Sequence, residues 1–132
     1  MTSAEVMDQS ILTSIKKLLM VEENYEYFDP DIIIHINTVL RILNQIGVGK
    51  ENFSIGSADE KWSDFIDIPE DRYYQYPIDC IKTYVYLKVK QLFDPAANSF
   101  VVNSFDNQIK ELEWRIQVMA DKPIKEEDVQ NG

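Results

Sequence analysis

Histidine and cysteine are the first side chains to consider for catalysis or metal binding, and this chain of 132 residues has one of each. His35 follows Asp31 by four residues, so on a helix both would lie on one face and offer two metal ligands. Two such ligands are weak evidence, since structural zinc sites need four and prefer sulfur or several imidazoles. Cys80 has no nearby cation except Lys82 to stabilise a thiolate. We therefore expect an ordinary histidine and a small buried cysteine.

Other patterns associated with chemistry are incomplete. The run Gly47 to Lys50 ends in Gly-Lys, but Asn44 stands where a phosphate-binding loop needs its first glycine and Glu51 follows the lysine. No nucleophile elbow, metalloprotease helix, calcium loop or dinucleotide fingerprint occurs. Acidic pairs are adjacent in sequence and read as solvated surface: Glu22-Glu23, Asp59-Glu60, Glu70-Asp71 and Glu126-Glu127. The sequence predicts no enzyme, no catalytic residues, no cofactor and no metal.

The remaining candidates are residues suited to binding another protein. Within a helix expected from about Ser99 to Met119, a rotation of about 100° per residue puts Trp114 nearly opposite the apolar seam. Phe100 and Val118 fall on the same far side, and Tyr86 lies on the polar side of the preceding helix. Because Trp and Tyr are enriched at interfaces, these four are candidate subunit contacts. The alternatives are packing under the N-terminal helices for the first three and an ordinary exposed ring for Tyr86.

A helical hairpin from Ile78 to Met119 must position these side chains, and the rest of the chain either covers it or projects from it. Residues 78–93 and 99–119 are separated by the polar break 94–98, which favours antiparallel neighbours. Apolar residues of the second helix recur at alternating steps of three and four, the rhythm of a packed seam. The expected seam is Ile78, Ile81, Val85, Val89 and Leu92 against Val102, Phe105, Ile109, Leu112, Ile116 and Met119.

Two helices are expected before the hairpin. The first spans Gln9 to Met20, with Ser10 or Asp8 as its N-cap and with Lys16 and Lys17 placed where cations complement the helix dipole.

The second of these helices has the clearest boundaries. It runs to Ile46, with Asp29 as a natural N-cap and Pro30 at the first helical position. Gly47 ends it as a C-terminal glycine.

The resulting fold class is all-α, a small bundle of four main helices around the long antiparallel hairpin. Residues 48–61 are expected to form an irregular loop, followed by a helical turn at 62–66 that covers one end of the core. A single domain spans 1–120. Residues 121–132 are a polar, acidic tail expected to be mobile, with Ile124 and Val129 as its sizeable apolar residues.

Charge is distributed unevenly along the chain. The formal net charge is −10. Residues 1–77 hold 14 acids and six bases, whereas residues 78–120 hold five of each. The acidic part would repel nucleic acid.

The sequence also bears on the compartment. No apolar run is long enough to cross a bilayer, and no signal peptide is visible. The lone cysteine is consistent with a protein that folds in a reducing cytoplasm.

Four segments, taken in order, resemble a known family. They are residues 11–19 (ILTSIKKLL), 28–49 (FDPDIIIHINTVLRILNQIGVG), 62–65 (WSDF) and 81–115, which includes IKTYVYLKVKQLFDP, QIKELE and Trp114-Arg115. Their order, spacing and total length are similar to the small head–tail connector (adaptor, head-completion) proteins of long-tailed bacteriophages and their prophages, also labelled DNA-packaging proteins.

The resemblance implies a mostly helical virion subunit, assembled in the host bacterial cytoplasm, that joins a ring at the head–tail interface. Such rings are commonly twelve-fold, lie beneath the portal, extend the DNA channel and dock the neck stopper or tail-completion protein. DNA would pass without sequence-specific binding. The resemblance also implies that the C-terminal segment, with Ile124 and Val129, engages the portal. The main alternative is a small acidic regulatory or DNA-mimic protein that binds a host factor.

Overall fold

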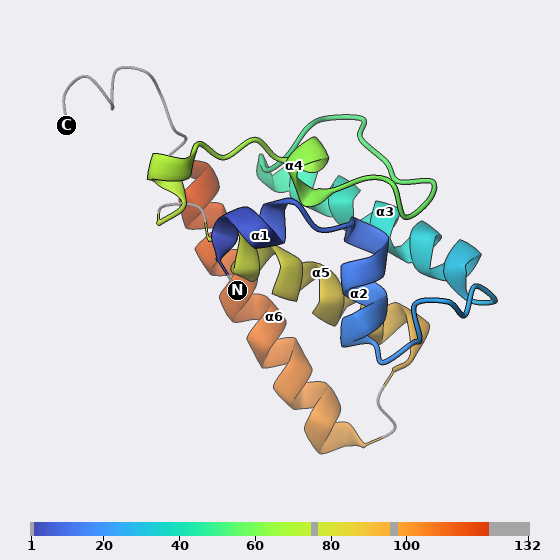
Figure 1. Cartoon of the computed structure of the whole chain (residues 1–132). Helices are drawn as coiled ribbons and strands as arrows, with labels where there is room; N and C mark the ends of the chain where they lie inside the picture. The colour runs from blue at the N-terminus through green and yellow to red at the C-terminus, as the bar shows by residue number, and fades with distance from the viewer. Residues whose placement is uncertain (1, 75–76, 96–97, 122–132) are drawn as a thin grey trace.

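The computed structural model describes residues 2–74, 77–95 and 98–121. Over these residues the chain is helical, with one isolated β-bridge between Ser10 and Lys61 and no strand (Figure 1). The elements are α1 (Ser3–Met7), α2 (Ile11–Leu18), α3 (Asp29–Ile46), α4 (Trp62–Phe65), the 3-10 turn η1 (Glu70–Arg72), α5 (Ile78–Phe93) and α6 (Ser99–Asp121). The expected all-α class is confirmed.

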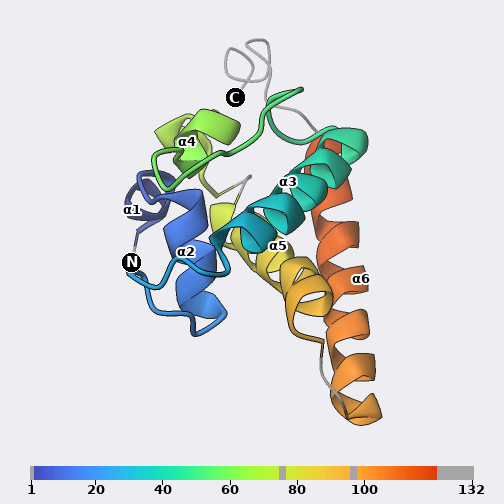
Figure 2. The same cartoon turned by 90° about the vertical axis from the view of Figure 1, so that its right-hand side faces the viewer.

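Helix α5 lies at the centre of the bundle. It contacts α1, α2, α3 and α6, and Figure 2 shows it between α2, α3 and α6. A helix covered on several sides needs apolar residues on more than one face. Accordingly its buried side chains are Ile78, Ile81, Tyr84, Val85, Leu87 and Val89.

Helices α5 and α6 form the expected hairpin, with bounds close to those inferred from sequence. Ile109, Ile116 and Met119 of the expected seam are buried, and its other α6 members are half-buried. Gln91 on α5 donates a hydrogen bond of 2.6 Å to the Asp106 carboxylate on α6. In both views the first turns of α6 extend beyond the rest of the bundle (Figures 1 and 2).

The placement of Leu92 in the seam was wrong. Its side chain is half exposed, because α6 diverges from α5 toward the connecting break. The neighbouring Phe93 packs edge-to-face on Phe28 instead, with ring centroids 5.3 Å apart. An aromatic contact to the N-terminal part of the chain therefore closes this end of α5.

The N-terminal part is divided differently from the expectation. Thr2 caps a short additional helix, α1, by accepting a hydrogen bond from the Glu5 N–H. Ser10 caps α2 as expected, accepting from the Thr13 N–H at 3.2 Å. The backbone at this junction bonds to the chain before α4, which separates α1 from α2.

Helix α3 begins at Asp29, so Asp29 is not the N-cap; Phe28 occupies that position without a side-chain capping bond. The Asp29 carboxylate is instead paired with a lysine of α2. Gly47 ends the helix as expected, in the left-handed conformation with φ of 103°.

Residues 48–61 form the expected irregular loop, held to the bundle by side chains. Asn37 on α3 both donates to the Ile55 carbonyl and accepts from the Ile55 N–H, at 3.0 and 2.8 Å. In the short α4, Trp62 and Phe65 are buried, and the Trp62 indole N–H donates to the Ser14 hydroxyl at 3.0 Å. The expected turn does cover one end of the core.

Candidate functional site

The outward face of α6 carries exposed apolar side chains. Trp114 is 67% exposed, Phe100 78% and Val118 37%. They are exposed because the opposite face of α6 packs on α5 through Ile109 and Ile116. The predicted orientation of these three residues is confirmed, and packing of the indole under the N-terminal helices is excluded. Their role as subunit contacts stays a prediction.

Spacing along α6 divides this face into two patches. Trp114 and Val118 are one turn apart, about 6 Å along the axis, so their side chains are neighbours. Phe100 lies 14 residues before Trp114, about 21 Å away along a helix. Phe100 belongs with the exposed Val101 on the projecting first turn, where the Asn98 side chain accepts hydrogen bonds from both backbone N–H groups.

Charged groups border the Trp114–Val118 patch. Arg115 and Glu111 form an ion pair of 2.9 Å across one turn of the helix. Both side chains are largely exposed, so the pair adds little to stability, but it places a carboxylate beside the indole. Asp121 is exposed at the end of the same helix. An apolar centre with a polar rim is the usual composition of a protein–protein contact.

The α5 tyrosines have different environments. Tyr86, the fourth candidate contact, is half-buried and packs against the core, so less of its ring is available to a partner. Tyr84 is fully buried, a core role that the sequence pattern missed. Burial and the Glu113 carboxylate of α6 raise the pKa of Tyr84 to about 12, so this phenol stays neutral.

The candidate tail residues Ile124 and Val129 lie outside the described residues.

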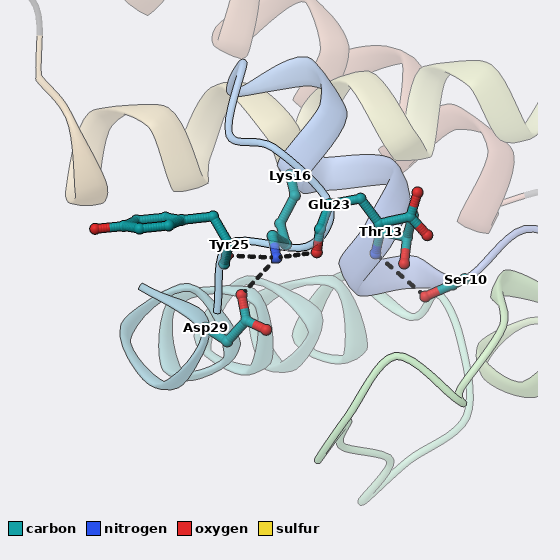
Figure 3. Close-up of polar contacts among 6 residues, drawn as sticks. All are labelled: Ser10, Thr13, Lys16, Glu23, Tyr25 and Asp29. Carbon is teal, nitrogen blue, oxygen red and sulfur yellow. Dashed lines mark hydrogen bonds and ion pairs between the residues drawn. The ribbon is translucent and has the colours of Figure 1, made fainter. Parts of the chain in front are cut away.

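A buried lysine organises the loop between α2 and α3 (Figure 3). Lys16 is 2% exposed, and its ammonium group donates to the carbonyl oxygens of Glu23 and Tyr25, each at 2.9 Å. It also pairs with Asp29 at 2.8 Å. The prediction that Lys16 merely complements the helix dipole missed this role. One signal was available: Lys16 stands four residues after Leu12, on the apolar stripe of α2.

The residues first considered for chemistry do not converge on a site. His35 and Cys80 are both half-buried. Burial raises the pKa of the Cys80 thiol despite the nearby Arg115, which makes the thiol a poor nucleophile at neutral pH. In the part of the chain that the structure describes, no group of three or more His, Cys, Asp or Glu side chains is arranged to hold a metal ion.

Residues 11–123 match the family model described as phage connector protein. Since the match spans most of the chain and contains all four segments of the resemblance, the chain belongs to the phage connector protein family. Comparison with curated proteins and with solved structures finds no match.

Membership of this family indicates a structural role in the virion, in contact with other head or tail proteins. The family is structural rather than enzymatic. None of the described helices combines the length and hydropathy that a membrane-spanning segment needs.

Proposed function

We propose that this protein forms a ring between the portal and the neck stopper or tail, where it extends the DNA channel and completes the head for tail joining. The Trp114–Val118 patch of α6 is the lateral contact between subunits. The exposure of Trp114 carries this proposal: a tryptophan that is two-thirds exposed costs free energy in water and is a typical interface anchor once covered. Phe100, on the first turn of α6, and Tyr86, on α5, remain secondary candidates for subunit contacts.

The charge distribution supports this arrangement. Residues 78–120, which carry the Trp114–Val118 patch, hold five acids and five bases, so this part of a subunit brings no net charge of its own to a contact with a neighbour. Residues 1–77 carry 14 acids against six bases, and such a surface repels the phosphate backbone. A channel lined by acidic segments lets DNA slide without sticking.

The portal is the proposed partner on the head side, contacted by the C-terminal segment with Ile124 and Val129. This part of the proposal rests on the family resemblance and on those two apolar side chains in an otherwise polar tail. The alternative function, an acidic regulatory or DNA-mimic protein, predicts a monomer without portal affinity. Membership of the connector family favours the ring.

The test is assembly in phage carrying Trp114→Ala, examined by electron microscopy and by co-sedimentation of the purified variant with the phage's portal. We expect DNA-filled heads without tails and weakened ring formation. Met20→Ala is a matched control, because Met20 is the most exposed large apolar residue described and lies on a different surface. Normal tailed particles from Trp114→Ala would remove this residue as the anchor, and a wild-type protein without portal affinity would overturn the proposed function.

A further inference from the structure

A ring of more than two identical subunits uses heterologous contacts, in which one patch on a subunit meets a different patch on the next. If the Trp114–Val118 patch of α6 is one half of the lateral contact, the same chain must carry the other half. The second patch must be exposed, must accept apolar side chains, and must lie on another side of the subunit.

The outward face of α3 meets the first two requirements. Ile34 is 60% exposed and shares a helical stripe with Thr38, Arg41 and Gln45. A shallow hollow of about 450 Å³ lies along this stripe. Its lining residues are Ile34, Asn37, Thr38, Arg41, Ile42 and Gln45. The lining combines two aliphatic side chains, Ile34 and Ile42, with the Thr38 hydroxyl and the Gln45 amide, a mixture that suits an indole, which is apolar except for one N–H donor.

Charge distinguishes this hollow from others on the molecule. Its lining contains the cation of Arg41 and no carboxylate. An adjoining hollow that Arg41 also lines contains Glu51, and two others contain Glu22 and Glu23 with Lys17, or Asp64 and Asp67 with Lys50. Arg41 is exposed and has no ion-pair partner among the described residues.

The α6 patch has the exposed carboxylate of Asp121, while the Glu111 carboxylate beside it is already paired with Arg115. Two copies of a chain with net charge −10 repel each other, so a contact between them needs a cation opposite an acid. Arg41 also has the guanidinium plane that stacks on a tryptophan ring.

The two faces belong to helices that run in different directions. Helices α3 and α6 both pack on α5 but from different directions, as Figures 1 and 2 show. They meet near their C-terminal ends, where a Cβ placed on Gly47 would lie 3.6 Å from the Cβ of Ala120. Because α3 and α6 diverge from this junction (Figure 2), they are separated along most of their length, and one subunit can use the exposed residues of both at once.

We infer that the α3 hollow around Ile34 and Arg41 receives Trp114 and Val118 from a second copy of this chain. This inference rests on the proposed function, since it supplies the partner surface for the proposed ring contact. The occupant is a second copy because the α6 patch of this chain matches the hollow in polarity and in charge.

A mixing experiment tests the pairing. Trp114→Asp disables the α6 patch, and the double variant Ile34→Asp with Arg41→Glu disables the α3 hollow. Met20→Asp with Lys50→Glu is the control. It likewise replaces an exposed apolar residue by aspartate and an exposed cation by glutamate, at positions outside both faces. Circular dichroism melting verifies that each variant folds. Native mass spectrometry and chemical cross-linking, over a range of protein concentrations and with the portal, report the oligomers.

We expect each disabled variant alone to associate at least tenfold more weakly than wild type, and the control to assemble normally. An equal mixture of the two disabled variants should form a heterodimer and nothing larger, since it contains one intact α6 patch and one intact α3 hollow per pair.

Three results overturn the inference. If the α3 variant assembles like wild type while Trp114→Asp does not, the α3 hollow is not the receiving surface and the proposed ring stands. If both variants fail and their mixture gives no heterodimer, the two faces do not pair. If wild type stays monomeric at every concentration and on the portal, the proposed function fails and the inference fails with it.

Discussion

The ammonium group of Lys16 lies 2.8 Å from the carboxylate of Asp29 and joins the second turn of α2 to the first residue of α3. The lysine is almost fully buried, and apart from this ion pair Asp29 Oδ1 has no hydrogen-bond partner in the described residues. A buried charge is tolerated only when it is paired and hydrogen-bonded. Here one cation satisfies two loop carbonyls and one carboxylate (Figure 3).

Replacement of Lys16 by methionine is expected to lower the free energy of unfolding by about 2–4 kcal/mol. The variant keeps the length of the side chain but leaves a partly buried carboxylate and two carbonyl groups without their donor. Chemical denaturation measures the change. Lys17→Met is the control, since Lys17 is exposed and should change stability by less than about 0.5 kcal/mol. Equal effects at both positions would show that the ion pair contributes nothing.

Replacement of Trp114 by alanine is expected to weaken each subunit contact by about 1–3 kcal/mol while leaving the monomer's unfolding free energy nearly unchanged. The indole is mostly exposed in the single chain, so its removal opens no cavity in the core. Sedimentation measures the association and thermal melting measures the fold. A loss of monomer stability comparable to the loss of association would assign Trp114 to intramolecular packing instead.

Replacement of Gly49 by alanine is expected to destabilise the fold by about 2–4 kcal/mol. Its φ is +85°, and an added Cβ would lie 2.2 Å from a ring atom of the buried Phe65. Gly56→Ala is the matched control on the same loop, because the nearest atom to its Cβ would be a Glu60 carboxylate oxygen at 4.0 Å. Thermal melting compares the two, and similar melting temperatures would contradict the predicted clash.

Through Glu60 the stability of the fold depends on pH, in a direction that follows from the pKa of this carboxyl. Partial burial acts to raise the pKa of this carboxyl, but hydrogen bonds from the backbone N–H groups of Gly56 and Ser57 outweigh it and leave the pKa below its ordinary value of 4.5. The unfolded chain therefore binds the proton of Glu60 more readily than the folded chain does. The stabilisation that the Glu60 carboxylate contributes to folding is fully present above its pKa in the unfolded chain, and it is lost as the pH falls through its pKa in the folded chain.

The comparison that tests this is the unfolding free energy of wild type and Glu60→Gln, measured from pH 7 down to the acid limit of folding. We expect wild type to be more stable at neutral pH and the two curves to converge in acid. Curves that remain parallel over the whole range would show that the Glu60 carboxylate does not stabilise the loop through these bonds.

The long periodic elements were predictable from sequence. Apolar spacing over many turns defines α5 and α6 closely, and the same spacing oriented Trp114 correctly because a rotation of 100° per residue accumulates little error across one helix. Gly47 was identified because a left-handed residue at a helix end favours glycine. These features depend on local geometry alone.

The misjudged features depend on contacts between distant segments. Lys16 and Asp29 form their pair only after a loop brings two helices together, so neither capping rules nor dipole rules reveal it. Tyr84 is buried because α5 is covered on several sides, which a single-face pattern does not anticipate. Leu92 is exposed because the hairpin splays near its break, and α1 is too short to show a period.

The junction of Gly47 with Ala120 has a consequence for the size of the proposed ring. At this point α3 and α6 approach closely, with room beside Gly47 for a Cβ at 3.6 Å from that of Ala120, and a larger side chain at either position would push the two helix ends apart. In a closed circle the turn from each copy to the next is the same, and the turns must total 360°. In the proposed ring, a change in the angle between α3 and α6 would thus change how many copies complete the circle, although neither Gly47 nor Ala120 belongs to the Trp114–Val118 patch or lines the α3 hollow.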